Sequence, residues 1–234
     1  MAGTLSYRER LGAIETYFDR TAVDAWARLT SDAPVGRIRA TVRAGREEMR
    51  NRLLSWLPDD LRGCRLLDAG CGTGAFAVEA AQRGAEVVAV DIAPNLIALA
   101  NERLPKSLGA GRIDFRVGDM ADPALGSFDY VVSMDALIHY APGDAVAALS
   151  ALAQRTRRAM VVTFAPRTPL LAAMHMAGQF FPRSDRSPAI IPVAQDALVA
   201  SIRGEKGLAD WRVGRMHRVS RGFYISQALE VART

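Results

Sequence analysis

The residues of this chain that most clearly indicate chemistry are one aspartate and three glycines at alternate positions: Asp68, Gly70, Gly72 and Gly74. Glycine has no β-carbon, so a ligand can lie directly against the backbone of such a turn. The helix predicted to begin at residue 74 offers unpaired N–H groups and the positive end of its dipole, which suit a carboxylate or a phosphate. Because Asp68 adds a negative charge, the turn favours a ligand that carries an ammonium group and a carboxylate together.

Acidic residues also end the next two predicted strands. Asp91 closes strand 86–92 and lies where a carboxylate holds the two hydroxyls of a ribose. Asp119 follows strand 113–118 and is suited to accept a hydrogen bond from an adenine amino group, with Met120 as an apolar wall. S-adenosylmethionine (SAM) carries all four of these groups: an ammonium, a carboxylate, a ribose and an adenine.

The same residues permit two other interpretations. Gly70, Gly72 and Ala75 match the dinucleotide fingerprint G-x-G-x-x-A, which an NAD-binding oxidoreductase would share. Asp91 and Asp119 also stand where a side chain caps the turn that follows, a role compatible with ligand binding. The order of the remaining elements has to decide between SAM and NAD.

Strands and helices alternate through the middle of the chain. Hydrophobic patterns predict strands at 65–70, 86–92, 113–118, 128–134 and 159–164, and helices at 74–83, 94–104, 143–156 and 193–206. This alternation predicts an α/β fold, a mostly parallel sheet with helices on both faces. Two last strands, 211–219 and 223–231, are separated by only three residues, so they must pair antiparallel. That terminal pair argues against a dehydrogenase.

Two helices are predicted before the first strand, at 5–30 and 34–57. Each has an apolar stripe at helical spacing, formed by Leu11, Ile14, Phe18, Trp26 and Leu29 in the first and by Val35, Ile38, Val42, Met49, Leu53 and Trp56 in the second. We expect them to cover the cofactor and shape a substrate pocket, and scaffold packing is the alternative.

An insertion separates the fifth predicted strand from the last helix. Its apolar residues are Leu170, Leu171, Met174 and Phe181. It leaves the edge of the sheet where ligands bind, so we interpret it as a lid or pocket wall for a large, flat, apolar ligand. A cover over the core and a membrane contact are alternatives. The chain then divides into an N-terminal helical cap at 1–58, a SAM-binding core at 59–165, the lid insertion at 166–192 and a completing segment at 193–234.

Composition narrows the classes of function. The 234 residues carry a net charge of +5, which favours an acidic substrate or surface, but no Lys/Arg run of the kind found in nucleic-acid-binding arms appears. Cys64 and Cys71, seven residues apart, suit neither a zinc site nor a disulfide framework, so buried thiols in a reducing cytoplasm are expected. Arg167 and Pro169 interrupt the most apolar stretch, so no membrane span is predicted.

Two levels of family resemblance follow. D-x-G-x-G-x-G at 68–74, Asp91, Gly118-Asp119-Met120 and F-D-Y-V at 128–131 resemble the class I SAM-dependent methyltransferases, with their Rossmann-like, seven-stranded sheet. Other segments are similar to the magnesium-protoporphyrin IX O-methyltransferases of bacteriochlorophyll and chlorophyll synthesis. These segments are Tyr17-Phe18 with Trp26, and residues 32–50, 136–140, 163–166, 182–188 and 221–224.

The resemblance implies methyl transfer from SAM to one propionate carboxylate of magnesium-protoporphyrin IX, giving the monomethyl ester and S-adenosylhomocysteine. The magnesium is carried by the porphyrin, and no protein-bound metal is expected. The residues expected to bind SAM are Asp68, Gly70, Cys71, Gly72, Gly74, Asp91, Ile92, Gly118, Asp119, Met120 and Met134. The family also implies contact with the large subunit of magnesium chelatase and peripheral association with a membrane. Another acceptor of the quinone type and a tetrapyrrole carrier are the alternatives.

The acceptor side needs orientation more than a base, because a carboxylate is already ionised at neutral pH. His139, just past the fourth strand, and Tyr17 on the first helix are the expected catalytic residues. Tyr140, Met174, Arg183 and Arg186 are expected to bind the substrate. A structural histidine, a core tyrosine and solvated arginines are the alternatives. Of Arg37, Arg39, Arg43 and Arg46, at most two can face the site, because they fall on more than one side of their helix.

Overall fold

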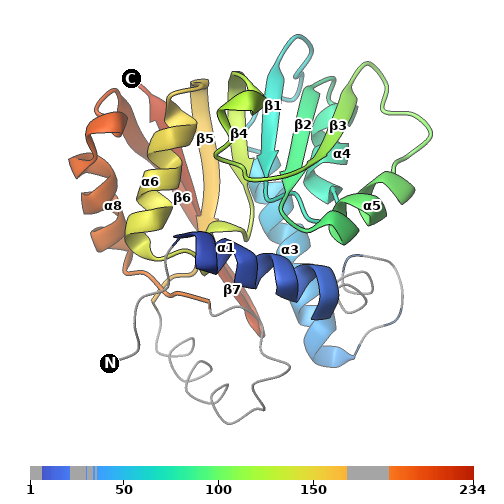
Figure 1. The fold of residues 1–234 in the computed structure, drawn as a ribbon, viewed down its shortest axis with the longest axis horizontal. Helices are drawn as coiled ribbons and strands as arrows, with labels where there is room; N and C mark the ends of the chain where they lie inside the picture. The colour runs from blue at the N-terminus through green and yellow to red at the C-terminus, as the bar shows by residue number, and fades with distance from the viewer. Residues whose placement is uncertain (1–6, 22–29, 31–33, 35, 168–189) are drawn as a thin grey trace.

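The protein is a single twisted sheet of seven strands with helices on both faces. The computed structural model describes residues 7–21, 30, 34, 36–167 and 190–234 (Figure 1). The strands are β1 Arg65–Ala69, β2 Glu86–Asp91, β3 Arg112–Val117, β4 Phe128–Ser133, β5 Thr156–Phe164, β6 Trp211–Arg221 and β7 Tyr224–Arg233. Their order across the sheet is β3-β2-β1-β4-β5-β7-β6. The first five are parallel, and β7 runs antiparallel to both β5 and β6.

The helices fill the connections between strands. The longer ones are α1 Tyr7–Thr16, α3 Arg37–Leu54, α4 Ala75–Gln82, α5 Pro94–Glu102, α6 Pro142–Ala153 and α8 Gln195–Gly204. The short turns are η1 Tyr17–Thr21, η2 Pro123–Leu125, η3 Leu137–His139 and η5 Lys206–Leu208. The α/β class, the parallel core and the terminal antiparallel pair predicted from the sequence are therefore confirmed.

The predicted boundary between α6 and β5 is wrong. The helix expected at 143–156 ends at Ala153, and β5 begins at Thr156, three residues before the predicted strand at 159. Arg157 and Arg158 are exposed members of β5, so they give no hydrophobic signal, although Thr156 already pairs with Phe128 of β4. Pairing with a neighbouring strand, which a local pattern does not contain, sets this boundary.

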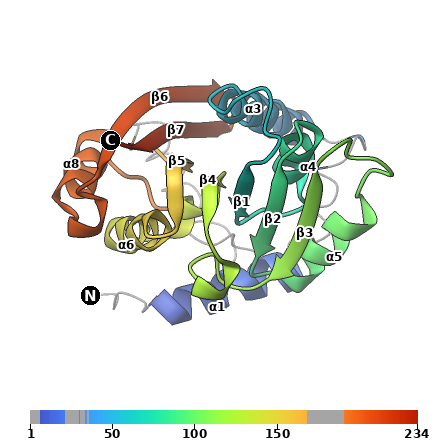
Figure 2. The ribbon, with the colours of Figure 1, turned by 90° about the horizontal axis from the view of Figure 1, so that it is seen from above.

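Side chains alternate between the two faces of the sheet. In β1, Leu66 points into the core cluster that contains residues of α3 and α4, whereas Leu67 points into the cluster shared with α6 and α8. Both residues are fully buried. Seen from above, α3 and α4 lie on one side of the strands and α6 on the other (Figure 2). Burial on both faces explains why these strands are continuous hydrophobic runs.

The long helix α3 belongs to this core. It buries Met49, Leu53 and Leu54 and packs on β6 and β7. The predicted apolar stripe is wrong at its first turn, because Ile38 is 56% exposed. Ile38 precedes the stretch of α3 whose side chains reach the core cluster, and so it finds no apolar partner there.

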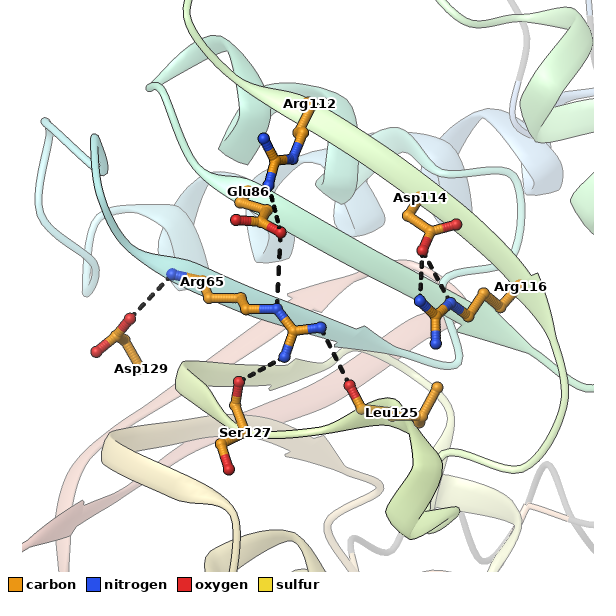
Figure 3. A network of polar contacts seen from close by, with 8 residues as sticks. All are labelled: Arg65, Glu86, Arg112, Asp114, Arg116, Leu125, Ser127 and Asp129. Atoms are coloured by element: carbon orange, nitrogen blue, oxygen red, sulfur yellow. Dashed lines mark hydrogen bonds and ion pairs between the residues drawn. The ribbon is translucent and has the colours of Figure 1, made fainter.

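The strand order sends the carboxyl ends of the parallel strands to one edge, and it reverses direction at β1, between β2 and β4. Ligands of open α/β sheets bind outside such a switch point. Figure 1 shows α1 lying across this edge. At the opposite edge, Figure 3 shows Arg65 joined to Glu86 and Asp129, which connects the beginnings of β1, β2 and β4. The amino edge of the parallel strands is thus held by polar contacts, whereas the carboxyl edge is where a ligand is expected.

A glycine allows α3 to approach the sheet closely. A β-carbon on Gly45 would lie 2.5 Å from Cδ1 and 2.8 Å from Cβ of Tyr224 on β7. We expect Gly45→Ala to lower the free energy of unfolding by about 1–3 kcal/mol, because the helix must move away from the strand. Urea unfolding measures this change.

The matched control is Gly143→Ala in the first turn of α6, where a β-carbon would meet no atom within 4 Å. We expect this variant to stay within about 0.5 kcal/mol of the wild type or to gain slightly. Equal stabilities of the two variants would contradict the close packing of α3 on β7.

Candidate functional site

A cavity of about 260 Å³ opens at the carboxyl edge of the sheet. Its floor comes from the ends of the first four strands, and Ile14 and Phe18 of α1 and η1 cover part of it. The strand-end residues that line it are Asp68, Gly70, Val90, Asp91, Gly118, Asp119, Met134 and Asp135. One cavity thus collects the aspartates that the sequence places after separate strands.

The glycine turn adopts a backbone that other residues disfavour. Gly70, Gly72 and Gly74 have φ of 78°, 55° and 77°, in the left-handed region that glycine tolerates. The turn is fixed to the end of β2, because Gly70 donates to the carbonyl of Val90 at 2.8 Å. A β-carbon on Gly70 would also lie 2.4 Å from that of Ala136. The absence of side chains here leaves backbone exposed to the cavity.

Asp68 is the most unusual charge of the site. Its side chain is only 2% exposed, and Oδ2 has no hydrogen-bond partner. Burial, and secondarily the charge of Asp91, raise its pKa to about 7, although the backbone N–H of Ala77 opposes the shift. A buried carboxylate oxygen without a donor is costly. An ammonium group of a ligand would supply the missing donor and the missing charge.

Asp91 and Asp119 already hold local structure. Asp91 accepts from the N–H of Gly72 at 2.8 Å and from that of Ala93 at 3.0 Å, and burial raises its pKa. Asp119 accepts from the N–H of Ala121 at 2.8 Å. Each side chain thus holds the backbone two residues further along, but the N-cap residues are Ala93 for α5 and Asp122 for η2, so the capping role considered from the sequence is not the one found. Both aspartates line the cavity. A carboxylate offers about four acceptor positions, so each can still accept from a ligand hydroxyl or amino group.

The rest of the predicted cofactor set also lines this cavity, except Gly74, which instead packs against Phe115. Ile92, Met120 and Met134 give apolar walls. Cys71 is half-buried in the lining, and burial raises the pKa of its thiol. Cys71 is therefore not the fully buried thiol expected from the sequence, whereas Cys64 is buried in the core.

Of the two predicted catalytic residues, His139 lines the cavity and Tyr17 does not. His139 is 6% exposed, lines the cavity and meets the ring of Phe18 edge-on, with centroids 5.7 Å apart. Tyr17 also meets the ring of Phe18 edge-on, with ring centroids 5.1 Å apart, and does not itself line the cavity. Tyr140 is buried and lines it. An aromatic cluster therefore joins the first helix to the residues after β4.

The insertion is anchored beside His139. Pro166 and Val193 form a parallel bridge, and Ile191 donates to the carbonyl of Ile138 at 2.8 Å. Both ends of the insertion thus lie together at the cavity edge. Met174, Arg183 and Arg186 fall outside the described residues.

The sequence did not predict that charged side chains of α3 form one wall of the cavity. Arg43, Arg46, Glu47 and Arg50 of α3 line the cavity, so two of the four arginines weighed from the sequence face it. The spacing i, i+3, i+7 was a usable signal, because it places Arg43, Arg46 and Arg50 on one helix face. Asp135 was missed although it ends a strand as Asp91 does. Across the described part of the chain, no group of three or more metal-ligating side chains is arranged around a metal position.

Comparison with known proteins gives consistent matches. Residues 133–233 match a family model described as magnesium-protoporphyrin IX methyltransferase C-terminus, and residues 66–159 match a methyltransferase domain. The magnesium-protoporphyrin O-methyltransferase of Rhodobacter capsulatus is 54% identical over 96% of this chain and 97% of that protein. A magnesium-protoporphyrin O-methyltransferase of Synechocystis is 31% identical over 94% of this chain and 95% of its own.

A solved structure of the same family as these relatives also matches this chain. The magnesium protoporphyrin IX methyltransferase from Synechocystis PCC 6803 with bound S-adenosylhomocysteine superposes with a TM-score of 0.82 at 28% identity, covering 94% of this chain and 98% of that one.

The buried carboxyl of Asp68 makes stability depend on pH. Its folded pKa of about 7 lies above the ordinary aspartate pKa of 3.8, so between these values the folded state holds a proton that the unfolded state releases. Stability is therefore lost as the pH rises toward 7. Asp68→Asn does not titrate, so its stability relative to wild type should rise by about 2–3 kcal/mol from pH 5 to pH 8.

Urea unfolding of both proteins without ligand at the two pH values measures this difference. A difference between variant and wild type that is the same at pH 5 and pH 8 would show that the carboxyl is already ionised at pH 5.

Proposed function

We propose that this chain, which belongs to the magnesium-protoporphyrin O-methyltransferase family, transfers a methyl group from SAM to a propionate carboxylate of magnesium-protoporphyrin IX. The products are the monomethyl ester and S-adenosylhomocysteine. The observation that carries the proposal is near end-to-end identity of 54% to a magnesium-protoporphyrin O-methyltransferase. The cavity adds support, because its groups match the donor.

The residues of the first three strand ends fit SAM. Asp68, with its buried Oδ2 lacking a donor, holds the ammonium. The glycine turn and the start of α4 offer N–H groups to the carboxylate. Asp91 accepts from the ribose hydroxyls, and Asp119 accepts from the adenine amino group. When bound, SAM supplies an electrophilic methyl group.

The acceptor carboxylate is the nucleophile, and it needs no general base because it is ionised at neutral pH. The protein then contributes by holding this carboxylate in line and excluding water around it. His139 lies within the cavity at the end of β4 and orients the propionate or supplies an axial nitrogen to the porphyrin's magnesium. Tyr17 supports it through Phe18.

The segment 166–192 forms the lid in this proposal, and its described ends meet beside His139. Tyr140 contributes an apolar wall from the cavity lining. Met174, Arg183 and Arg186 contact the macrocycle and its second propionate. A large flat acceptor with two anionic tails agrees with the apolar character of this insertion and with the net charge of +5.

The resemblance adds two expectations about location. One is contact with the large subunit of magnesium chelatase, and the other is peripheral membrane association of a cytoplasmic protein. Within the described segments, no helix is both long and apolar enough to cross a bilayer. Membrane contact is therefore proposed through the protein surface.

Purified protein incubated with SAM and magnesium-protoporphyrin IX should add a single methyl group, read by mass spectrometry. His139→Phe should lower kcat/KM at least about tenfold, equivalent to about 1.4 kcal/mol, because the imidazole is lost from the cavity. Phenylalanine preserves a ring against Phe18, so the loss reports on the imidazole nitrogens.

His217→Phe, the same substitution in β6 outside the cavity lining, is the control and should keep wild-type activity. Equal rates of wild type and His139→Phe would remove His139 from the reaction. Porphyrin binding without methyl transfer from SAM would replace the enzyme by a tetrapyrrole carrier.

A further inference from the structure

Asp135 has an uncommon backbone conformation. Within the described segments it is the one non-glycine residue with positive φ, at 56°. This conformation costs about 1–2 kcal/mol per residue and persists where the surroundings fix it. Asp135 lies two residues after the end of β4 and lines the cavity. Its strain therefore lies at the edge where the acceptor must enter.

The surroundings that fix Asp135 come from three other elements. Its N–H donates to Oγ1 of Thr163 on β5 at 2.7 Å. Its carboxylate is 5% exposed and accepts from the hydroxyl of Tyr224 at 3.0 Å and from that of Ser226 at 3.2 Å, both on β7. Arg46 of α3 donates to Oδ2 at 2.5 Å. A buried carboxylate with this many donors is rigidly held.

Two features keep this arrangement intact. Burial and the neighbouring Asp135 raise the pKa of Tyr224 well above its usual value, so its phenol stays protonated and donates. Gly45 lets α3 touch the ring of Tyr224, which places the next residue, Arg46, beside Asp135. The ion pair is thus built by the same close packing that docks α3.

The position of the pair along the sheet separates it from the donor. The groups suited to adenine and ribose end β3 and β2, and Asp68, suited to the ammonium, lies near the end of β1. The next strands in the sheet are β4, β5 and β7, which carry Asp135 and its hydroxyl partners. Arg46 donates to Asp135 and also lines the cavity with a side chain that is 21% exposed, so it joins this network to the cavity.

We propose that Arg46 binds a propionate carboxylate of the acceptor and that Asp135 is the positioning residue that fixes the direction of its guanidinium. This inference rests on the proposed function and names one contact within it. A guanidinium is a planar fork of five N–H donors and can bridge two carboxylates, one from the protein and one from the ligand. Holding the fork in advance lowers the conformational entropy lost on binding.

The test compares magnesium-protoporphyrin IX with its dimethyl ester, whose propionates carry no charge. Porphyrin fluorescence, with saturating S-adenosylhomocysteine, gives Kd for each form. In the wild type we expect the diacid to bind at least about tenfold more tightly than the diester. In Arg46→Gln, and in Arg46→Lys, which keeps the charge but loses the fork, this ratio should fall at least threefold.

Two further variants protect the conclusion from a folding defect. Arg46→Gln combined with Asp135→Asn leaves no unpaired buried charge, and asparagine tolerates positive φ. In this double variant, the preference for the diacid over the diester should match that of Arg46→Gln. Asp135→Asn alone should keep the ratio within threefold of wild type but lower kcat about tenfold, because Arg46 still attracts the carboxylate without aiming it. Arg39→Gln, on the exposed part of α3, is the matched control.

An unchanged ratio in every Arg46 variant would overturn the proposal, and weaker S-adenosylhomocysteine binding in the same variants would assign Arg46 to the donor instead. Wild-type kcat in Asp135→Asn would overturn the positioning role. Failure of the wild type to bind or methylate the diacid would overturn the proposed function itself, an outcome separate from either of these.

Discussion

The parallel pairing of β1 with both β2 and β4 is the constraint on which the site depends. Asp68, near the end of β1, pairs in register with Ala89 and with Val132, so the chain must leave the sheet in opposite directions on its two sides. That divergence opens the space at the carboxyl edge. It also explains why the glycine turn bonds to Val90 of β2 while Gly70 touches Ala136 after β4. A β-carbon at position 70 would lie only 2.4 Å from that of Ala136.

The same edge holds several aspartates, and they differ in how many hydrogen-bond donors surround each carboxylate. Asp91 and Asp135 are satisfied by backbone or hydroxyl donors, whereas Asp68 keeps one buried oxygen without a donor. A fold selected only for stability would avoid such a group, since its ionisation costs free energy near neutral pH. Binding of a cation repays that cost when the ligand arrives. In the function that we propose, this carboxyl therefore links the stability of the fold to binding of the methyl donor.

Local patterns predicted the core strands and the cofactor side, because both depend on residues close together in sequence. Asp68 and its three glycines form a turn within seven residues, and strand periodicity follows burial. The acceptor side depends on contacts between distant segments. Arg46 meets Asp135 across 89 residues, and Tyr224 reaches the same carboxylate from the last strand. Helical spacing places Arg46 on one face with Arg43 and Arg50, but it does not show that Asp135 lies opposite this face. The start of β5 and the exposure of Ile38 were missed for the same reason.

The chemistry assigned to this site explains why its polar groups fix positions rather than move protons. An ionised carboxylate attacking a methyl group has no proton to lose, so a titrating base would add nothing to the reaction. The protein's contribution is then to place a flexible propionate against the methyl carbon, and correct alignment is worth up to about 7–11 kcal/mol. A flexible arginine would place it poorly. Arg46 is held by a buried aspartate with positive φ, on a helix docked through Gly45. In the arrangement that we propose, these contacts transfer the rigidity of the sheet to the orientation of the acceptor.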